Sequence, residues 1–455
     1  MIGIYMFGAA LLMLVIGYPV AFTFGAVSML FGAFAAFANI IPDNWTFLHF
    51  FMGWDFADFT DEFLQMFAMM PFRIYSIMTN KILMAVPLFI FMGIVLQKSD
   101  LATRLLESMG VLFGKVRGGL AVSTVLIGAL LAASTGVVGA SVVAMGVISL
   151  PIMLKHGYSK TLSTGTICAA GTLGQIIPPS IVLIVLGDVF QLPVGDLFKF
   201  AFFPGIMLVA IYIIYILAVA FIDKDAAPAV KMDDSLTKAQ NIKKALIAII
   251  PPLVLIVLVL GSIFAGIATP TESASVGSLG ALILAWGYKK LNWKMVKESS
   301  LETIKITAMV FGILIGATAF SMVFVYSGAD DITAQFMTHL PGAKWGFLIL
   351  SMLAIMFLGF FIDFIEISYI VVPILIPIAN VIGIDPLWFA ILIALNLQTS
   401  FLTPPFGFSL FYLKGVAPPN VKTTDIYKGV IPFITLQVIV LISVVLFPGF
   451  YGFHA

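Results

Sequence analysis

Two stretches of this chain place hydroxyl, amide and carboxylate side chains beside helix-breaking residues, inside sequence that is otherwise apolar. The first covers residues 134–180 and the second covers residues 359–407, and each contains a Pro-Pro pair near its end. A Pro-Pro pair removes two backbone donors, so it interrupts a helix and frees carbonyl groups that lipid cannot satisfy. Freed carbonyls and Ser or Thr hydroxyls are hard oxygen ligands, which suit sodium without burying a full charge. These residue types therefore predict ion binding inside a membrane.

The first stretch begins with small and hydroxyl residues around Ser134, Thr135 and Gly136. Such residues let two backbones approach closely and leave carbonyl groups unpaired at the tip of a hairpin. Tight helix packing is the alternative, because this is the usual role of small residues in membranes. We prefer the ion site for Ser134 and Thr135, because they accompany a double-proline break. Residues 171–180 supply the facing unwound segment.

The second stretch differs because it carries two carboxylates, Asp363 and Glu366, within an apolar run. Ionisable groups inside a membrane are costly and mark functional sites by default. The two are three positions apart, so on a helix they share a face. They can coordinate a cation, relay a proton or cap the start of a helix, and Asp is a favoured N-cap residue. Function and capping both stay open for Asp363, and a functional role is the interpretation we prefer for Glu366.

The helix that follows is unusually polar just before its break. It carries five polar residues within eight positions, namely Asn396, Gln398, Thr399, Ser400 and Thr403. Polar groups exposed to hydrocarbon are costly. This helix is therefore not expected to face lipid.

The same pattern of helix breakers occurs twice, 226 positions apart and without a gap. The matching residues are Pro151 and Pro377, Gly157 and Gly383, and the pairs Pro178-Pro179 and Pro404-Pro405. Coincidences of this kind in a single register favour an internal duplication over chance. Broken helices at matching positions in two halves are the best sequence indication of a transporter binding site, and such repeats are commonly inverted in topology.

The composition predicts an integral membrane protein. Hydrophobic residues make up 61% of the 455-residue chain and charged residues only 10%. Apolar runs of roughly 20 residues, each able to span a hydrocarbon core of about 30 Å, predict about ten or eleven full spans and two re-entrant hairpins. The net charge of +1 and basic residues confined to short loops predict no nucleic-acid partner. A single cysteine, Cys168, and histidines without metal spacing predict neither a disulfide framework nor a transition-metal site.

A polar segment at residues 223–244 divides the chain into two halves, residues 1–222 and 245–455. Within the halves we expect a hairpin at about 120–154 and a broken helix at about 161–190, then a hairpin at about 360–382 and a broken helix at about 387–414. The lysine-rich loop at residues 289–305 is expected to face the cytoplasm. The predicted fold class is an all-α polytopic membrane protein with two inverted repeats.

Other classes of function fit the sequence less well. An intramembrane enzyme is disfavoured, because the chain has no HExxH motif, no GxSxG within a span and no GxGD. A primary pump is unsupported, since there is no GxxxxGK[ST] motif and no sizeable soluble domain to hold a nucleotide. Within transport, the alternative is a self-sufficient anion or sodium/proton transporter of similar broken-helix architecture, which would need no binding protein.

Four stretches resemble the large membrane (permease) subunit of TRAP transporters, the tripartite ATP-independent periplasmic family. They read LLAASTGVVGASVVAMGVISLPIML, GYSKTLSTGTICAAGTLGQIIPPSIVLIVLGD, FIDFIEISYIVVPILIPIA and NLQTSFLTPPFGFSLFYLKG, and the resemblance runs from end to end. It implies a permease of the bacterial or archaeal cytoplasmic (inner) membrane that takes up organic acids, such as C4-dicarboxylates, by sodium symport with an elevator-type motion. It implies sodium as the coupling ion and no other cofactor.

The resemblance also implies two partner proteins, a small four-helix membrane subunit and a periplasmic substrate-binding protein. No small-subunit sequence precedes Met1, so the small subunit is expected to be a separate chain. No Arg lies in the hairpins or the Pro-Pro helices. An anionic substrate is therefore expected to depend on helix N-termini, backbone amides and bound sodium.

Two sodium sites follow from the same resemblance. The first would involve Ser134, Thr135, Gly136, Gly174, Ile177 and Pro179. The second would involve Gly359, Asp363, Thr399, Ser400 and Thr403. The residues considered for substrate binding or ion coupling are Gly171, Thr172, Glu366, Asn396, Gln398 and Pro405.

Overall fold

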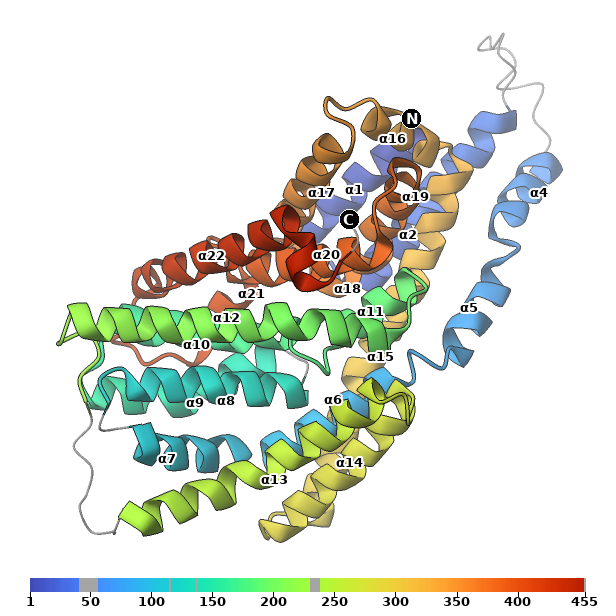
Figure 1. The fold of residues 1–455 in the computed structure, drawn as a ribbon. Helices are drawn as coiled ribbons and strands as arrows, with labels where there is room; N and C mark the ends of the chain where they lie inside the picture. Colours follow the sequence, from blue (N-terminus) through green and yellow to red (C-terminus); the bar gives the residue numbers. More distant parts are fainter. Residues whose placement is uncertain (41–55, 114–115, 136–137, 230–237, 454–455) are drawn as a thin grey trace. The chain divides into compact units, whose positions relative to one another are not determined.

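The computed structural model describes residues 1–40, 56–113, 116–135, 138–229 and 238–453, and all regular structure in these ranges is helical (Figure 1). The predicted fold class, an all-α polytopic membrane protein, is confirmed. Seven of the described helices are long and apolar enough to cross a membrane, and five further apolar helices of 10–17 residues are shorter. The apolar runs predicted more full spans than this. Gly17 shows one reason. Its left-handed backbone (φ 102°) ends the helix Ile2–Ile16 after 15 residues, within a longer apolar run, and the helix is then too short to count as a full span.

The helices form two compact units, and each unit is assembled from separate segments of the chain. The first unit comprises Met1–Asn80, Ile306–Ala354 and Phe361–Ile384. The second comprises Lys81–Lys305, Ile355–Phe360 and Asp385–Ala455. Both units take segments from both halves of the sequence, so a compact unit is not the same as a sequence half.

The helices of the first unit are α1 (Ile2–Ile16), α2 (Val20–Ile40), α4 (Phe56–Phe67), α5 (Met70–Thr79), the later part of α15 (Trp293–Tyr326), α16 (Ala329–Thr338), most of α17 (Lys344–Leu358), α18 (Phe364–Glu366), the π-helix η2 (Ile367–Val371) and α19 (Val372–Ile382). α1 packs against α2 and α16. α15 lies close to α2, because a side-chain carbon on Gly316 would meet the Ala21 carbonyl oxygen. The Phe320 ring meets Phe24 edge-on, with 5.2 Å between their centroids. Apolar packing thus holds this unit together.

The helices of the second unit are α6 (Ala85–Lys98), α7 (Leu101–Phe113), α8 (Gly119–Thr135), α9 (Val138–Lys155), α10 (Lys160–Thr172), the 3-10 helix η1 (Leu173–Gln175), α11 (Ile181–Val189), α12 (Val194–Ile222), α13 (Lys238–Phe264), α14 (Pro270–Gly287), the first turns of α15, the end of α17, α20 (Pro386–Leu402), α21 (Phe408–Val416), α22 (Thr423–Leu446) and the 3-10 helix η3 (Pro448–Tyr451). α8, α9 and α10 pack on one another (Figure 1). α10 also lies along α22.

Glycine allows α10 to approach its neighbours closely. A side-chain carbon on Gly165 would meet the backbone carbonyl of Gly429 on α22, and one on Gly429 would meet the carbonyl of Thr161. On another side, a side-chain carbon on Gly128 of α8 would meet Ala170. The close contacts bury every residue of α10 from Leu162 to Thr172. The packing therefore fixes the helix that leads into the first Pro-Pro pair.

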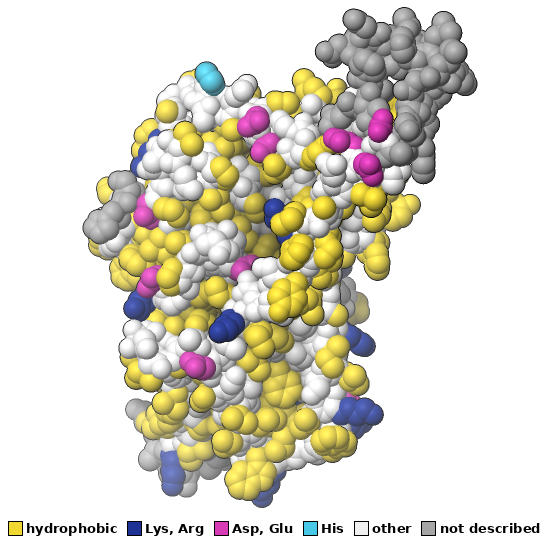
Figure 2. All heavy atoms as spheres, turned by 90° about the vertical axis from the view of Figure 1, so that its right-hand side faces the viewer, with side chains coloured by type: hydrophobic (Ala, Val, Ile, Leu, Met, Phe, Trp, Pro, Cys, Tyr) yellow, Lys and Arg dark blue, Asp and Glu magenta, His cyan; other side chains and the backbone are white. Residues whose placement is uncertain are grey.

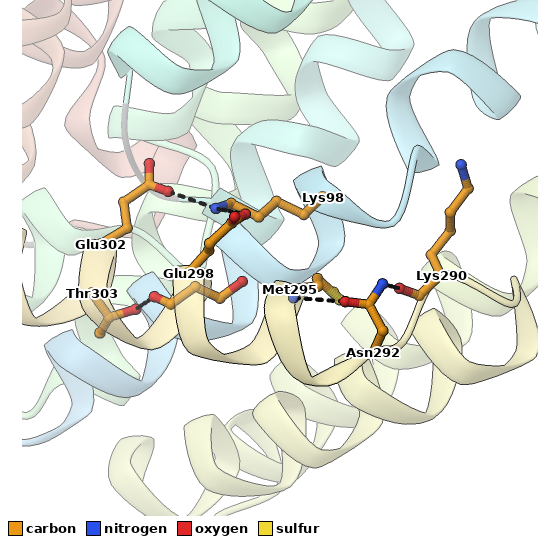
Figure 3. A network of polar contacts seen from close by, with 8 residues as sticks. Lys98, Lys290, Asn292, Met295, Glu298, Glu302 and Thr303 are labelled. Atoms are coloured by element: carbon orange, nitrogen blue, oxygen red, sulfur yellow. Dashed lines mark hydrogen bonds and ion pairs between the residues drawn. The ribbon is translucent and has the colours of Figure 1, made fainter.

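Polar contacts between the end of α6 and the start of α15, in the second unit, are partly exposed (Figure 3). The Lys98 ammonium group at the end of α6 lies 3.6 Å from a carboxylate oxygen of Glu298 and 3.3 Å from one of Glu302, both on α15. The Glu298 and Glu302 side chains are about half exposed, 49% and 48%, so each pair contributes about 0–1 kcal/mol. These exposed pairs therefore add little to the stability of the unit.

The two halves repeat the same order of elements in the register that the prolines predict. α10 and α11 correspond to α20 and α21, and α9 corresponds to the continuous segment from α18 to α19. Equivalent residues also cap equivalent helices. The side chain of Ser159 accepts from the Leu162 amide at the start of α10, and that of Asp385 accepts from the Trp388 amide at the start of α20. The structure therefore supports an internal duplication.

The outer faces of the long helices are apolar. Phe221 and Ile222 of α12 are 83% and 82% exposed, and Figure 2 shows apolar side chains spread over the face that it presents. In water such surfaces would cause aggregation, whereas in a bilayer they meet lipid. This exposure agrees with a multi-pass membrane protein.

Candidate functional site

The first helix break lies between α10 and α11. The 3-10 turn η1 follows α10 directly, and residues 176–180 are not helical. Ser180, the last residue of this segment, is hydrogen-bonded to the structure on each side of it. Its hydroxyl donates to the Gln175 carbonyl before the segment (2.6 Å) and accepts from the Leu183 amide after it (3.4 Å). The predicted ion-site residues Gly174 and Pro179 are buried here, and Ile177 is partly buried. The break is therefore a hydrogen-bonded turn at the end of a buried helix.

The other half of the first predicted sodium site lies outside the described part of the chain. This applies to the side chains of Ser134 and Thr135 and to the whole of Gly136. Their assignment as ion ligands stays a prediction.

The second helix break follows α20 and carries a row of hydroxyl groups. Thr399 donates to the Leu395 carbonyl (2.9 Å), Ser400 to the Leu397 carbonyl (2.8 Å) and Thr403 to the Thr399 carbonyl (2.8 Å). Thr399 is 1% exposed and Ser400 is fully buried. A hydroxyl that donates its proton in this way keeps lone pairs on its oxygen for a cation. The arrangement can therefore supply oxygen ligands without any charged group.

The structure brings Gly359 to this row of hydroxyls. Gly359 lies just after the end of α17, and a side-chain carbon there would meet the Cβ and Oγ atoms of Ser400. Only glycine allows the backbone of residue 359 to come this near. Four of the five residues predicted for the second sodium site, Gly359, Thr399, Ser400 and Thr403, thus lie in the second unit.

The carboxylates belong to the first unit and are described there by themselves. Asp363 is the N-cap residue of α18, and its Oδ1 atom accepts from the Phe364 amide (2.6 Å). The capping role considered for Asp363 is therefore present in the structure. Glu366 follows one turn later and is 3% exposed, which is unusual for a carboxylate. Its burial in a membrane helix keeps it a candidate for ion coupling.

The remaining predicted residues lie on the broken helices or the segments beside them. A side-chain carbon on Gly171 would meet Val142 of α9. The Thr172 hydroxyl donates to the Ala169 carbonyl (2.9 Å), and the Pro405 carbonyl accepts from the Tyr427 hydroxyl (2.9 Å). Asn396 and Gln398 are buried on α20.

Sequence reasoning missed two buried amides. Gln437 of α22 donates to the Thr172 hydroxyl (3.4 Å), and Gln175 ends η1 with its side chain fully buried. A lone amide in an apolar helix was the available signal for Gln437. Within the described ranges, no three His, Cys, Asp or Glu residues gather as a metal cluster would require.

Comparison with known proteins points in one direction. Residues 7–450 match the family described as "Tripartite ATP-independent periplasmic transporter, DctM component". The C4-dicarboxylate TRAP transporter large permease protein DctM of Pseudomonas aeruginosa is 32% identical over 379 residues, which are 83% of this chain and 87% of that protein. The sialic acid TRAP transporter large permease protein SiaM of Vibrio cholerae is 28% identical over 372 residues, 82% of this chain and 85% of its own length.

Two further similarities extend this picture. The isethionate TRAP transporter permease protein DctMQ of Oleidesulfovibrio alaskensis is 31% identical over 375 residues, 82% of this chain and 58% of that protein. The crystal structure of the Alcanivorax borkumensis YdaH transporter superposes with a TM-score of 0.63 at 14% identity, covering 97% of this chain and 98% of that one. At that identity the likeness concerns the fold.

Proposed function

Because the chain belongs to the DctM family of TRAP transporter large permease subunits, we propose that it takes up an organic acid by sodium symport across the cytoplasmic membrane of a bacterium or archaeon. The relatives are named as permeases rather than enzymes. Their names refer to C4-dicarboxylates, sialic acid and isethionate, which are all organic anions. The cargo proposed for this chain is an organic acid of that broad class.

The row of hydroxyls at the second break is the observation that carries the sodium proposal. Thr399, Ser400 and Thr403 offer oxygen lone pairs beside Gly359 in a buried place. The duplicated break at Pro178-Pro179 offers the equivalent segment to a second sodium ion. Sodium bound at both breaks compensates the charge of the acid, which would be costly to carry through a low dielectric alone.

The transport cycle follows from this coupling. Sodium and acid together stabilise a form that can cross the membrane, whereas either alone leaves unpaired charge. The two inverted repeats move the broken helices as an elevator, with the other spans as scaffold. A small membrane subunit and a periplasmic binding protein are the partners, and the binding protein delivers the acid.

Reconstitution tests the tripartite part of this proposal. Proteoliposomes contain the chain with or without its small membrane subunit, and its soluble binding protein is added or withheld. We expect uptake of a radiolabelled organic acid only when both partners are present. Uptake by this chain alone would instead favour the self-sufficient anion or sodium/proton transporter.

Removing one hydroxyl from either predicted sodium site should weaken the response to sodium. We expect Ser134→Ala and Thr399→Ala each to raise the half-saturating sodium concentration about tenfold, because losing one ligand worth about 1.4 kcal/mol has this effect. Uptake is measured over a sodium titration, and folded protein is measured by size-exclusion chromatography. Thr399→Ser keeps a hydroxyl and is the matched control. Sodium activation unchanged in both Ala variants would remove these residues from the ion sites.

Two substitutions of Asp363 distinguish the effect of its carboxylate charge from the effect of its helix-capping hydrogen bond. Asp363→Asn keeps a capping side chain and removes the carboxylate charge. We expect uptake at limiting sodium to fall about tenfold, with a melting temperature near that of the wild type. Asp363→Ala loses the cap as well, so it should also lose about 1 kcal/mol of stability. Normal sodium-dependent uptake by Asp363→Asn would leave Asp363 with the capping role alone.

A further inference from the structure

Two fully buried glutamines lie at the helix breaks. Gln175 ends η1, just before Pro178-Pro179, and Gln398 lies on α20, in the turns that lead to Pro404-Pro405. Both side chains are 0% exposed. They belong to the same unit, and η1 is in contact with α20. Each break thus carries one fully buried amide, on two elements that touch.

Neither amide has a hydrogen-bond partner among the residues that the structure describes. This holds for the oxygen and the nitrogen of both side chains. Gln437 differs, because its nitrogen donates to the Thr172 hydroxyl. Buried polar groups in native proteins are nearly always paired, and leaving one unpaired is destabilising. Two unpaired amides, each within a stretch already considered for ion and substrate binding, therefore indicate a ligand.

The chemistry of an amide limits what that ligand can be. Each side chain has two N–H donors and one oxygen acceptor. A sodium ion would satisfy the oxygen and leave both donors unpaired. A carboxylate would satisfy the donors, and a hydroxyl group on the same molecule would satisfy the oxygen. A neutral amide also binds a carboxylate without burying an unpaired positive charge.

The two glutamines break the symmetry of the repeat. The position equivalent to Gln175 in the second half is Phe401, and the position equivalent to Gln398 in the first half is Thr172. One asymmetric molecule between the halves needs different residues from each. The pair therefore fits the acid better than it fits the ions.

We propose that Gln175 and Gln398 together bind the transported organic acid, and that the preferred cargo carries a hydroxyl group as well as a carboxylate. The N–H groups donate to carboxylate oxygens, and the amide oxygens accept from the hydroxyl. This inference rests on the proposed function and adds the chemical class of the cargo to it.

The test compares matched acids that differ by a hydroxyl group. Radiolabelled malate with succinate, lactate with propionate, and gluconate with hexanoate are offered to proteoliposomes holding the wild-type complex, Gln175→Leu or Gln398→Leu. The same binding protein is used throughout, so its own preference cancels between variants. For the pair of acids that the wild type transports, we expect the ratio of uptake of the hydroxylated acid to uptake of the unhydroxylated acid to fall about tenfold in each Leu variant. The half-saturating sodium concentration should not change.

Stability and a control complete the design. Both Leu variants should melt at or above the wild-type temperature, because an unpaired buried amide is removed. Gln191→Leu is a control for the loss of a glutamine outside the breaks, since the Gln191 amide already donates to the Asp188 carbonyl, and its uptake ratio should equal that of the wild type.

Several results would overturn the inference while the proposed function stands. They are an unchanged uptake ratio in both Leu variants, an increased half-saturating sodium concentration with an unchanged ratio, a lower melting temperature with normal uptake, and a wild type that prefers the unhydroxylated acid. A wild type that takes up none of the acids with sodium and binding protein present would contradict the proposed function, and the inference with it.

Discussion

Gly165→Val is expected to leave little folded protein after detergent extraction. Any side chain at this position meets the backbone carbonyl of Gly429, and the reverse contact joins Gly429 to the carbonyl of Thr161. A carbonyl within a helix cannot turn aside as a side chain can, so α10 and α22 must separate. Overpacking costs typically 1–3 kcal/mol and more where nothing can move, so we expect a loss of at least about 3 kcal/mol.

Thermal unfolding of the purified chain, with its size-exclusion profile, measures this effect. Gly261→Val is the matched control, because Gly261 lies on α13 and a side-chain carbon there would have no heavy atom of a neighbour within 4 Å. It should melt within a few degrees of the wild type. A Gly165→Val protein that melts like the wild type would show that α10 and α22 do not pack as described.

Gly359→Val is expected to abolish sodium-driven uptake while leaving most of the protein folded. The valine side chain would occupy the space of the Ser400 Cβ and Oγ atoms, so the row of hydroxyls before Pro404 would be displaced. The Ser400 Oγ atom can rotate away but the Cβ atom cannot, so the valine displaces the last turn of α20, which is a local change at the end of that helix. Displacing ligands by about 1 Å costs a site on the order of 100-fold, and we expect uptake to fall by at least this factor.

A second substitution at Ser400 distinguishes the effect of the steric clash from the effect of losing the Ser400 hydroxyl. Gly359→Ala combined with Ser400→Gly makes room for the new methyl group but lacks the Ser400 hydroxyl. The double variant should recover the wild-type melting temperature without recovering the wild-type sodium affinity. Full recovery of uptake at low sodium would mean that Ser400 is not an ion ligand.

Local sequence rules were sufficient for the helix breaks. The double prolines interrupt their helices, and Gly157 and Gly383 both take left-handed backbone, with φ of 81° and 78°. Ser159 and Asp385 cap the helices that follow. Each of these features depends on a few neighbouring residues, which is why a sequence pattern could reveal them.

Features that depend on distant contacts could not be predicted in this way. Gly165 and Gly429 lie in different halves of the chain, and nothing near either residue indicates that their helices touch. The composition of the two compact units is hidden for the same reason. The sequence showed Gln175 only as one residue of the stretch before Pro178-Pro179. Its lack of a hydrogen-bond partner depends on every element packed around it, so no local pattern could indicate it.

Sodium-driven accumulation tests the central claim most directly. Proteoliposomes with the complete complex are given the transported acid under an inward sodium gradient, under equal sodium on both sides, and with potassium replacing sodium. The account predicts that the acid rises above its external concentration only under the inward sodium gradient. Equal accumulation in all three conditions would contradict sodium binding at the helix breaks as the source of transport.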